Sequence, residues 1–246
     1  MHRCRRLLFL VPLLLAGSAH ADFTIDFHLG NSVKPPTRLE ISQAGYEDVE
    51  ISNVRYETRP WLPNTNLANF TQNYYDLRVG YYPFGADART IDLGFELELL
   101  HDKAYYESGD DPDDVVQHFE LSDGVNYLLI NAVGRYPIGI TDQFPHGRAQ
   151  VLVRAGMGVV VTAPASTIRG QSLGHDLHGT YRGYDLAGPG FQVAAQARQF
   201  ILPWLAISTE GKYTYSSPKQ YIAGGTARTY LPTLHLNVGL SFVPGW

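Results

Sequence analysis

The sequence predicts an all-β chain, an eight-stranded antiparallel transmembrane β-barrel of the outer-membrane type that follows an N-terminal signal peptide. Three observations carry this prediction: an export signal, eight segments in which apolar and polar residues alternate, and connections that alternate between short and long. We expect two units, the signal peptide over residues 1–21 and one barrel domain over residues 22–246.

The first 21 residues have the three parts of a secretory signal peptide: a basic region over 3–6, an apolar run over 7–15 and an A-x-A cleavage site over 19–21. The single cysteine, Cys4, would leave with it, so the mature chain can form neither a disulfide nor a thiolate metal site. Removal of three of the 19 basic residues leaves 16 against 24 acidic ones, a net charge of −8. This charge argues against a nucleic-acid partner. No later apolar run reaches the length of a transmembrane helix.

The strands are predicted from a period of two. Apolar residues stand at every second position from Ile91 to Leu99, and the positions between them include Asp92, Glu96 and Glu98. Such alternation indicates a strand with one apolar face. The eight segments with this pattern are 22–29, 74–81, 89–99, 124–136, 149–159, 191–198, 205–215 and 233–242.

Periodicity alone does not separate a membrane barrel from a soluble sandwich or a lipocalin-like barrel, because turning every strand inside out preserves it. Connections after the second, fourth and sixth segments are short, and those over 31–70, 102–120 and 162–186 are long. Short periplasmic turns and long extracellular loops are typical of bacterial outer-membrane barrels. The Gly and Ala content of the polar face and the C-terminal aromatics favour the same location. Because these aromatics resemble the assembly signal of such barrels, we expect the outer-membrane assembly machinery as a partner.

The polar face of the predicted barrel carries both signs of charge. The carboxylates of the third segment would face the basic residues Arg78, Arg135, Arg154, Arg198 and Lys212 across a narrow lumen. Eight strands leave an interior that side chains can fill, and buried charges need partners. We therefore expect most interior charge to form structural ion pairs.

Candidate site residues concentrate between His101 and Asn126, which the topology places at the outer mouth. His101, Asp102 and Lys103 could supply a general base, an orienting carboxylate and a cation for phosphate. Adjacent strand residues point to opposite faces, so all three enter one site only if the strand has already ended. The alternative is a charged strand end at the headgroup boundary.

Two further groups of residues complete the candidate site. Glu120, Asp123 and Asn126 are spaced by three, and their oxygens could hold a hard divalent cation; the alternative is a solvated loop. Glu210 and Lys212 lie on one face of the seventh segment, which leads toward the same end of the barrel; the alternative is that they pair with each other or with the lumen arginines. We expect the site residues to converge above the bilayer midplane. The sequence does not otherwise indicate a cofactor.

Five stretches resemble a known family when read in order: HDKAYY, FELSDGVNYLLINAVGRYP, GPGFQVAAQ, STEGKYTYS and LHLNVGLSF. Together, over about residues 70–242, they resemble the eight-stranded outer-membrane barrels known as lipid A oxidase-like proteins. The resemblance implies an oxygen-dependent oxidation of the proximal glucosamine of lipid A to an aminogluconate. It implies lipopolysaccharide and outer-membrane lipid as partners. The matching positions are His101, Asp102, Lys103, Asp123, Gly124, Asn126, Glu210 and Lys212.

Two function classes follow from the sequence. One is an enzyme that modifies lipid A, most concretely an oxidase. The other is a non-catalytic barrel for envelope integrity, surface binding or small-solute passage. Fold alone does not choose between them, because barrels host many roles.

Overall fold

The computed structural model describes residues 21–58, 74–84, 91–174 and 184–244. Most of the predicted signal peptide, the Trp-containing part of the first long connection and the C-terminal Trp246 lie outside these residues. Within the described ranges every regular element is a β-strand, and no helix is long and apolar enough to cross a membrane.

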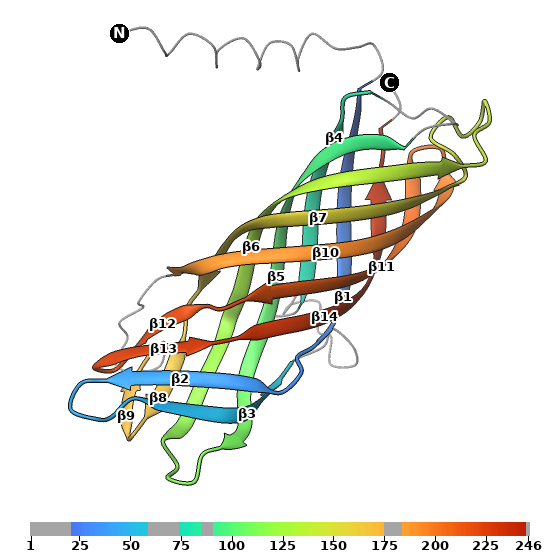
Figure 1. Cartoon of the computed structure of the whole chain (residues 1–246). Coiled ribbons are helices and arrows are strands. Elements are labelled where there is room, and N and C mark those ends of the chain that lie inside the picture. Colours follow the sequence, from blue (N-terminus) through green and yellow to red (C-terminus); the bar gives the residue numbers. More distant parts are fainter. Residues whose placement is uncertain (1–20, 59–73, 85–90, 175–183, 245–246) are drawn as a thin grey trace, which may run out of the picture.

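Eight strands close into a ring (Figure 1). Each pairs antiparallel with its neighbours in the order β5-β4-β1-β14-β11-β10-β7-β6, and the pairing of β5 with β6 completes the circle. The predicted barrel is therefore confirmed. The strands of the ring are β1 (Asp22–Val33), β4 (Tyr75–Tyr82), β5 (Asp92–Asp110), β6 (Val116–Ile138), β7 (Ala149–Thr162), β10 (Asp185–Leu202), β11 (Leu205–Ser216) and β14 (Leu231–Phe242).

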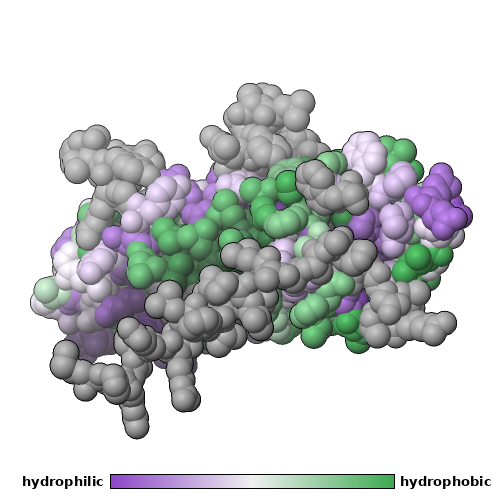
Figure 2. All heavy atoms as spheres, turned by 90° about the horizontal axis from the view of Figure 1, so that it is seen from above, coloured by the Kyte–Doolittle hydropathy of each residue, from purple (hydrophilic) through white to green (hydrophobic). Residues whose placement is uncertain are grey.

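The ring puts apolar side chains outside and polar ones inside, as a barrel in lipid requires. On β5 the outward residues Leu93, Phe95 and Leu97 are 59%, 56% and 63% exposed, whereas Glu96 and Glu98 between them are buried. Outward apolar residues on the other seven strands complete a belt around the barrel. Figure 2 shows hydrophobic residues over the middle of one face and hydrophilic ones mainly toward its ends.

Six further strands lie beyond the ring at the end opposite the start of β1 (Figure 1). Together with the far ends of β5 and β6 they form a curved sheet in the order β12-β13-β2-β3-β5-β6-β8-β9, which we call the outer sheet. The added strands are β2 (Thr37–Gln43), β3 (Val49–Glu57), β8 (Ala165–Ile168), β9 (Gln171–Leu173), β12 (Lys219–Ile222) and β13 (Gly225–Thr229).

The outer sheet has a hydrophobic core of its own above the lumen. Leu39, Ile51, Phe119, Leu121 and Ile168 are at most 1% exposed and belong to this core. Tyr56 lies in the same core and bonds to Thr229 Oγ1 at 2.6 Å, and burial raises the pKa of its hydroxyl above the usual range.

This outer sheet corrects the expectation that residues 31–70, 102–120 and 162–186 are long loops, since strands occupy most of the described part of all three. Period-two alternation missed them because several of these strands are short and β5 is buried on both faces from Leu100 to Tyr105.

Candidate functional site

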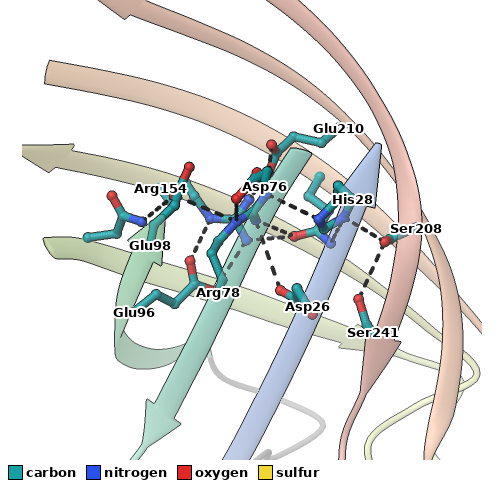
Figure 3. A network of polar contacts seen from close by, with 12 residues as sticks. Asp26, His28, Asp76, Arg78, Glu96, Glu98, Arg154, Ser208, Glu210 and Ser241 are labelled. Carbon is teal, nitrogen blue, oxygen red and sulfur yellow. Dashed lines mark hydrogen bonds and ion pairs between the residues drawn. The ribbon is translucent and has the colours of Figure 1, made fainter. Parts of the chain in front are cut away.

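Charged side chains fill the lumen in a continuous network of ion pairs (Figure 3). Arg78 lies between the carboxylates of Asp76, at 2.5 Å, and Glu210, at 2.8 Å. Arg154 bonds to Glu96 at 2.7 Å and also pairs with Glu210. The prediction that interior charge forms ion pairs is confirmed.

Lys212 belongs to the same network. Its ammonium lies 2.6 Å from Asp76 Oδ2, contacts Glu98 Oε1 and lies 3.3 Å from Glu210 Oε1. Glu210 also accepts a hydrogen bond from Asn237. Glu210 and Lys212 therefore hold the lumen together, and their described contacts are with other lumen residues.

Both ends of the lumen are closed by apolar residues. The core of the outer sheet covers the outer end. At the other end Phe144, in the connection between β6 and β7, packs with Phe200, Ala206 and Val243. In the part of the chain that the structure describes, ion pairs therefore occupy the lumen and apolar side chains lie at each of its ends, which is typical of an eight-stranded barrel with a filled interior.

The apolar belt, the closed ring and the filled polar lumen decide the setting of the protein. Only helices and closed barrels satisfy all backbone groups within lipid, and here the exposed wall is apolar. The chain is an integral protein of the bacterial outer membrane.

Asp102 faces inward at the top of the lumen. Its carboxylate accepts hydrogen bonds from Lys34 Nζ at 2.7 Å and from Ser32 Oγ at 2.7 Å, and both Asp102 and Lys34 are buried. Burial lowers the pKa of Lys34, and the carboxylate of Asp102 opposes that shift. Because Lys34 lies between β1 and β2, this pair ties the outer sheet to the barrel.

His101 faces the opposite way, toward the outer wall. It is paired across the sheet with Tyr75 on β4 and Asn126 on β6, so the three side chains form one outward row. The His101 ring stacks on Tyr75 with centroids 4.9 Å apart and planes 11° apart. His101 Nδ1 lies 2.7 Å from Asn126 Oδ1.

A bulge next to this row brings Asp123 and Lys103 to the same part of the wall. Between the paired positions Asp102↔Val125 and Ala104↔Leu121, the single residue Lys103 stands opposite residues 122–124. The backbone oxygen of Asp123 accepts a hydrogen bond from Tyr184 at 3.1 Å. The charges of Lys103 and Asp123 both act on the His101 ring. We call His101, Lys103, Asp123 and Asn126 the outer-wall cluster.

The outer-wall cluster lies at the upper edge of the apolar belt. The outward column from Ile91 to Leu99 covers eight residue steps, about 26 Å along the strand and roughly 20 Å of height at a tilt of about 40°. His101 is two steps further, at about 25 Å, which is the usual height of the apolar band. Lipid headgroups meet acyl chains at this level.

The structure thus divides the predicted site. Four of its residues form the outer-wall cluster, whereas Asp102, Glu210 and Lys212 point into the barrel and pair there. The expectation that Asp102, Asp123 and Lys212 converge at one site stays a prediction. In the structure β5 continues to Asp110, so Asp102 faces the lumen with Lys212, while Asp123 lies in the bulge opposite Lys103. The sequence reading missed Tyr75 and Tyr184.

The described residues contain no group of three or more His, Cys, Asp or Glu side chains placed to hold a metal ion. The carboxylate of Glu120 accepts a hydrogen bond from Ser122 Oγ, and the backbone oxygen of Asp123 accepts from Asn126 and Tyr184. A divalent cation bound by Glu120, Asp123 and Asn126 therefore remains a sequence-based prediction.

Comparisons with known proteins give structural likeness only. No family model matches the chain, and no curated protein matches it. Among solved structures, it is similar to outer membrane protein OprG from Pseudomonas aeruginosa, with 11% identity, TM-score 0.47 and coverage of 94% of this chain and 99% of that one. It is also similar to outer membrane protease OmpT from Escherichia coli, with 14% identity, TM-score 0.42 and coverage of 91% and 97%. Neisserial surface protein A matches with 10% identity, TM-score 0.38 and coverage of 91% and 98%.

Proposed function

We propose that the protein modifies lipid A in the outer leaflet, using the outer-wall cluster. The observation that carries this proposal is the outward row of Tyr75, His101 and Asn126 at the upper edge of the apolar belt. A histidine held by an amide is a common form of proton-transfer group. His101 belongs to the outward face of β5, the side of the barrel wall that meets the membrane, and lipid A would reach its buried ring only after neighbouring side chains move aside.

The specific reaction we propose is the oxidation of the proximal glucosamine to an aminogluconate. It follows from the resemblance to lipid A oxidase-like barrels. Of the eight matching positions, five lie in or beside the outer-wall cluster and three point into the lumen, namely Asp102, Glu210 and Lys212. Converting C1 of the sugar from the aldehyde to the acid level takes up one oxygen atom from water and releases two electrons and two protons, which reduce dioxygen to hydrogen peroxide. Dioxygen is the acceptor in this proposal, and a divalent cation could assist.

Mass spectrometry of lipid A from cells with and without the protein tests this proposal. The expected result is a gain of one oxygen atom in the proximal sugar, present only when the protein is expressed and oxygen is supplied. The His101→Gln variant should assemble normally and lose the product, while Tyr213→Phe, an outward residue on β11, should retain it. Identical lipid A in both strains would contradict an activity on lipid A.

The second candidate is a non-catalytic barrel that binds at the cell surface or supports the envelope. The folded outer sheet favours it, because its exposed face carries both signs of charge; Arg38, Glu40 and Glu50 lie close together on it. Unchanged lipid A together with an envelope that leaks in the absence of the protein would favour this candidate. Passage of small solutes is the least supported role, because the lumen is filled.

Assembly through the C-terminal strand is also a proposal. β14 ends at Phe242, which faces outward and contacts Trp204 edge-on at 5.6 Å. Replacing Phe242 with Ser should reduce assembly more than replacing the outward Leu234 at the other end of the same strand. Immunoblots of outer-membrane fractions would compare the two variants, and equal recovery would contradict a special role of the terminal aromatic.

A further inference from the structure

The hydrogen bond between His101 and Asn126 fixes the tautomer of the histidine. Asn126 Oδ1 can only accept a hydrogen bond, so His101 Nδ1 must donate and carries the proton. In the neutral ring the lone pair then lies on Nε2.

The orientation of the Asn126 amide is fixed independently by the backbone. Its Nδ2 lies 3.3 Å from the carbonyl oxygen of Val161 on β7 and 3.5 Å from that of Asp123. Both partners are acceptors, so the NH₂ group belongs on that side and the oxygen on the side of His101.

The backbone is shaped around the imidazole ring. Gly124 has a φ of +110°, a conformation that favours glycine, and a Cβ at this position would lie 2.4 Å from His101 Cε1. Tyr75 stacks on the ring, and the side chain as a whole is only 5% exposed. The glycine therefore leaves the space that the ring occupies, and any side chain at this position would displace the ring.

The Nε2 atom of His101 has no hydrogen-bond partner among the described residues, although it is buried. Leaving a buried polar atom unpaired costs about 1–3 kcal/mol. A donor brought in by a ligand would recover that cost. His101 lies at the upper edge of the apolar belt, where acyl chains meet headgroups. The sugar hydroxyl groups of glycolipids are the donors at this level.

We propose that His101 Nε2 is the atom that accepts a proton from a sugar hydroxyl of an outer-leaflet glycolipid, and that Asn126 is its positioning residue. The O–H bond breaks, the proton moves to Nε2 and the electron pair stays on the sugar oxygen, while Nδ1–H remains bonded to Asn126. This inference rests on the proposed function for the identity of the lipid, and it assigns the acceptor atom within the same site.

Three charged groups besides His101 influence its protonation. Lys103 and Asp102 come from β5, and Asp123 comes from the bulge of β6; Tyr75 on β4 is the remaining titratable side chain in contact with the ring. They remain in place in the variants proposed below, so a change in pH dependence can be assigned to residue 126.

Nitrogen NMR of the histidine-labelled full barrel in bilayers tests the assignment directly. The His101 signal is identified by its loss in His101→Gln. In phosphatidylcholine bilayers we expect the proton on Nδ1, and addition of lipid A should shift the Nε2 signal as it accepts a hydrogen bond. Asn126→Leu should release the tautomer, whereas Asn126→Asp should keep it, since a carboxylate also accepts from Nδ1. A proton found on Nε2 in the wild-type protein, or an Nε2 signal unaffected by lipid A, would overturn the inference.

Activity measurements separate this inference from the proposed function. With Asn126→Leu the rate should fall about 10²-fold, the usual scale of acid–base assistance. Asn126→Asp should retain most of the rate, with the acid limb of the pH profile moved to higher pH, because the carboxylate favours the charged ring. Lipid A oxidation that survives both His101→Gln and Asn126→Leu would refute the inference and leave the proposed function standing. An Nε2 signal that responds to lipid A while no product forms would do the reverse.

Discussion

Replacing Arg154 with Met is expected to destabilise the barrel strongly, because Arg154 is the cation that bonds to the buried carboxylate of Glu96 in the central ion-pair network (Figure 3). Its guanidinium donates to both oxygens of Glu96, at 2.7 and 3.2 Å, to Gln196 at 2.6 Å and to Glu210. All of these groups are buried.

The size of the effect follows from what remains after the substitution. Glu210 keeps Arg78 and Lys212, so its charge stays compensated. Glu96 keeps the Tyr82 hydroxyl at 3.0 Å but loses its cation among the described residues. Breaking a buried ion pair by removing one partner costs about 3–5 kcal/mol. Removing the charge of Glu96 as well should return part of that loss, by about 1–3 kcal/mol.

Equilibrium urea unfolding in lipid vesicles, followed by circular dichroism and by the mobility of unboiled samples on gels, measures these free energies. We expect Arg154→Met to be less stable than the double variant Arg154→Met/Glu96→Gln. Arg228→Met, at an exposed position of β13, is the matched control and should change stability by at most about 0.5 kcal/mol. The single variant Glu96→Gln is measured as well. If the double variant loses as much unfolding free energy as the two single variants together, the reasoning is refuted.

Three further predictions concern the closure of the barrel and its outer sheet. Lys34→Met leaves the buried Asp102 without the cation that it pairs with in the structure. Limited proteolysis should then cut the outer sheet sooner, while unboiled samples should still migrate as a folded barrel on gels. Unchanged proteolysis would contradict the role of this ion pair in holding the outer sheet to the barrel. Gly158→Ala should abolish assembly, seen as loss of the fast-migrating gel band, because a Cβ would lie 1.9 Å from the backbone oxygen of Leu128, whereas Gly211→Ala, with open space, should assemble normally. The purified protein should give no steady current in planar bilayers, and a stable ohmic conductance would contradict the closed lumen.

The barrel could be predicted from the sequence because its two faces see very different solvents. Because lipid lies outside and ion pairs lie inside, adjacent positions of a strand carry apolar and polar side chains in turn. The outward apolar residues from Ile91 to Leu99 show this alternation. The outer sheet sees neither lipid nor an ionic lumen. Its strands pack around an apolar core that Leu39 and Ile51 enter from separate short segments, and short segments carry little periodic signal.

The candidate site could be predicted in part. The residue types and their height were accessible, because His101 follows the apolar column of its own strand. Which site residues face the outer wall and which face the lumen depends on where β5 ends. The sequence reading left that point open, and the structure continues β5 through His101 and Asp102 to Asp110. Tyr75 could not be found from one strand alone, because its contact with His101 depends on the register between β4 and β5.

The same alternation explains why neighbouring residues of one motif have different roles. Asp102 turns inward, where an unpaired carboxylate would be costly, and it is held by Lys34 and Ser32. His101 turns outward, where its Nδ1 is bonded and its Nε2 is not. Charges inside the barrel neutralise one another and stabilise the fold, so they have little capacity left for a ligand. His101 Nε2 is oriented and unsatisfied, although it is buried on the outward side of the wall, so a ligand that reaches it would supply its missing hydrogen bond.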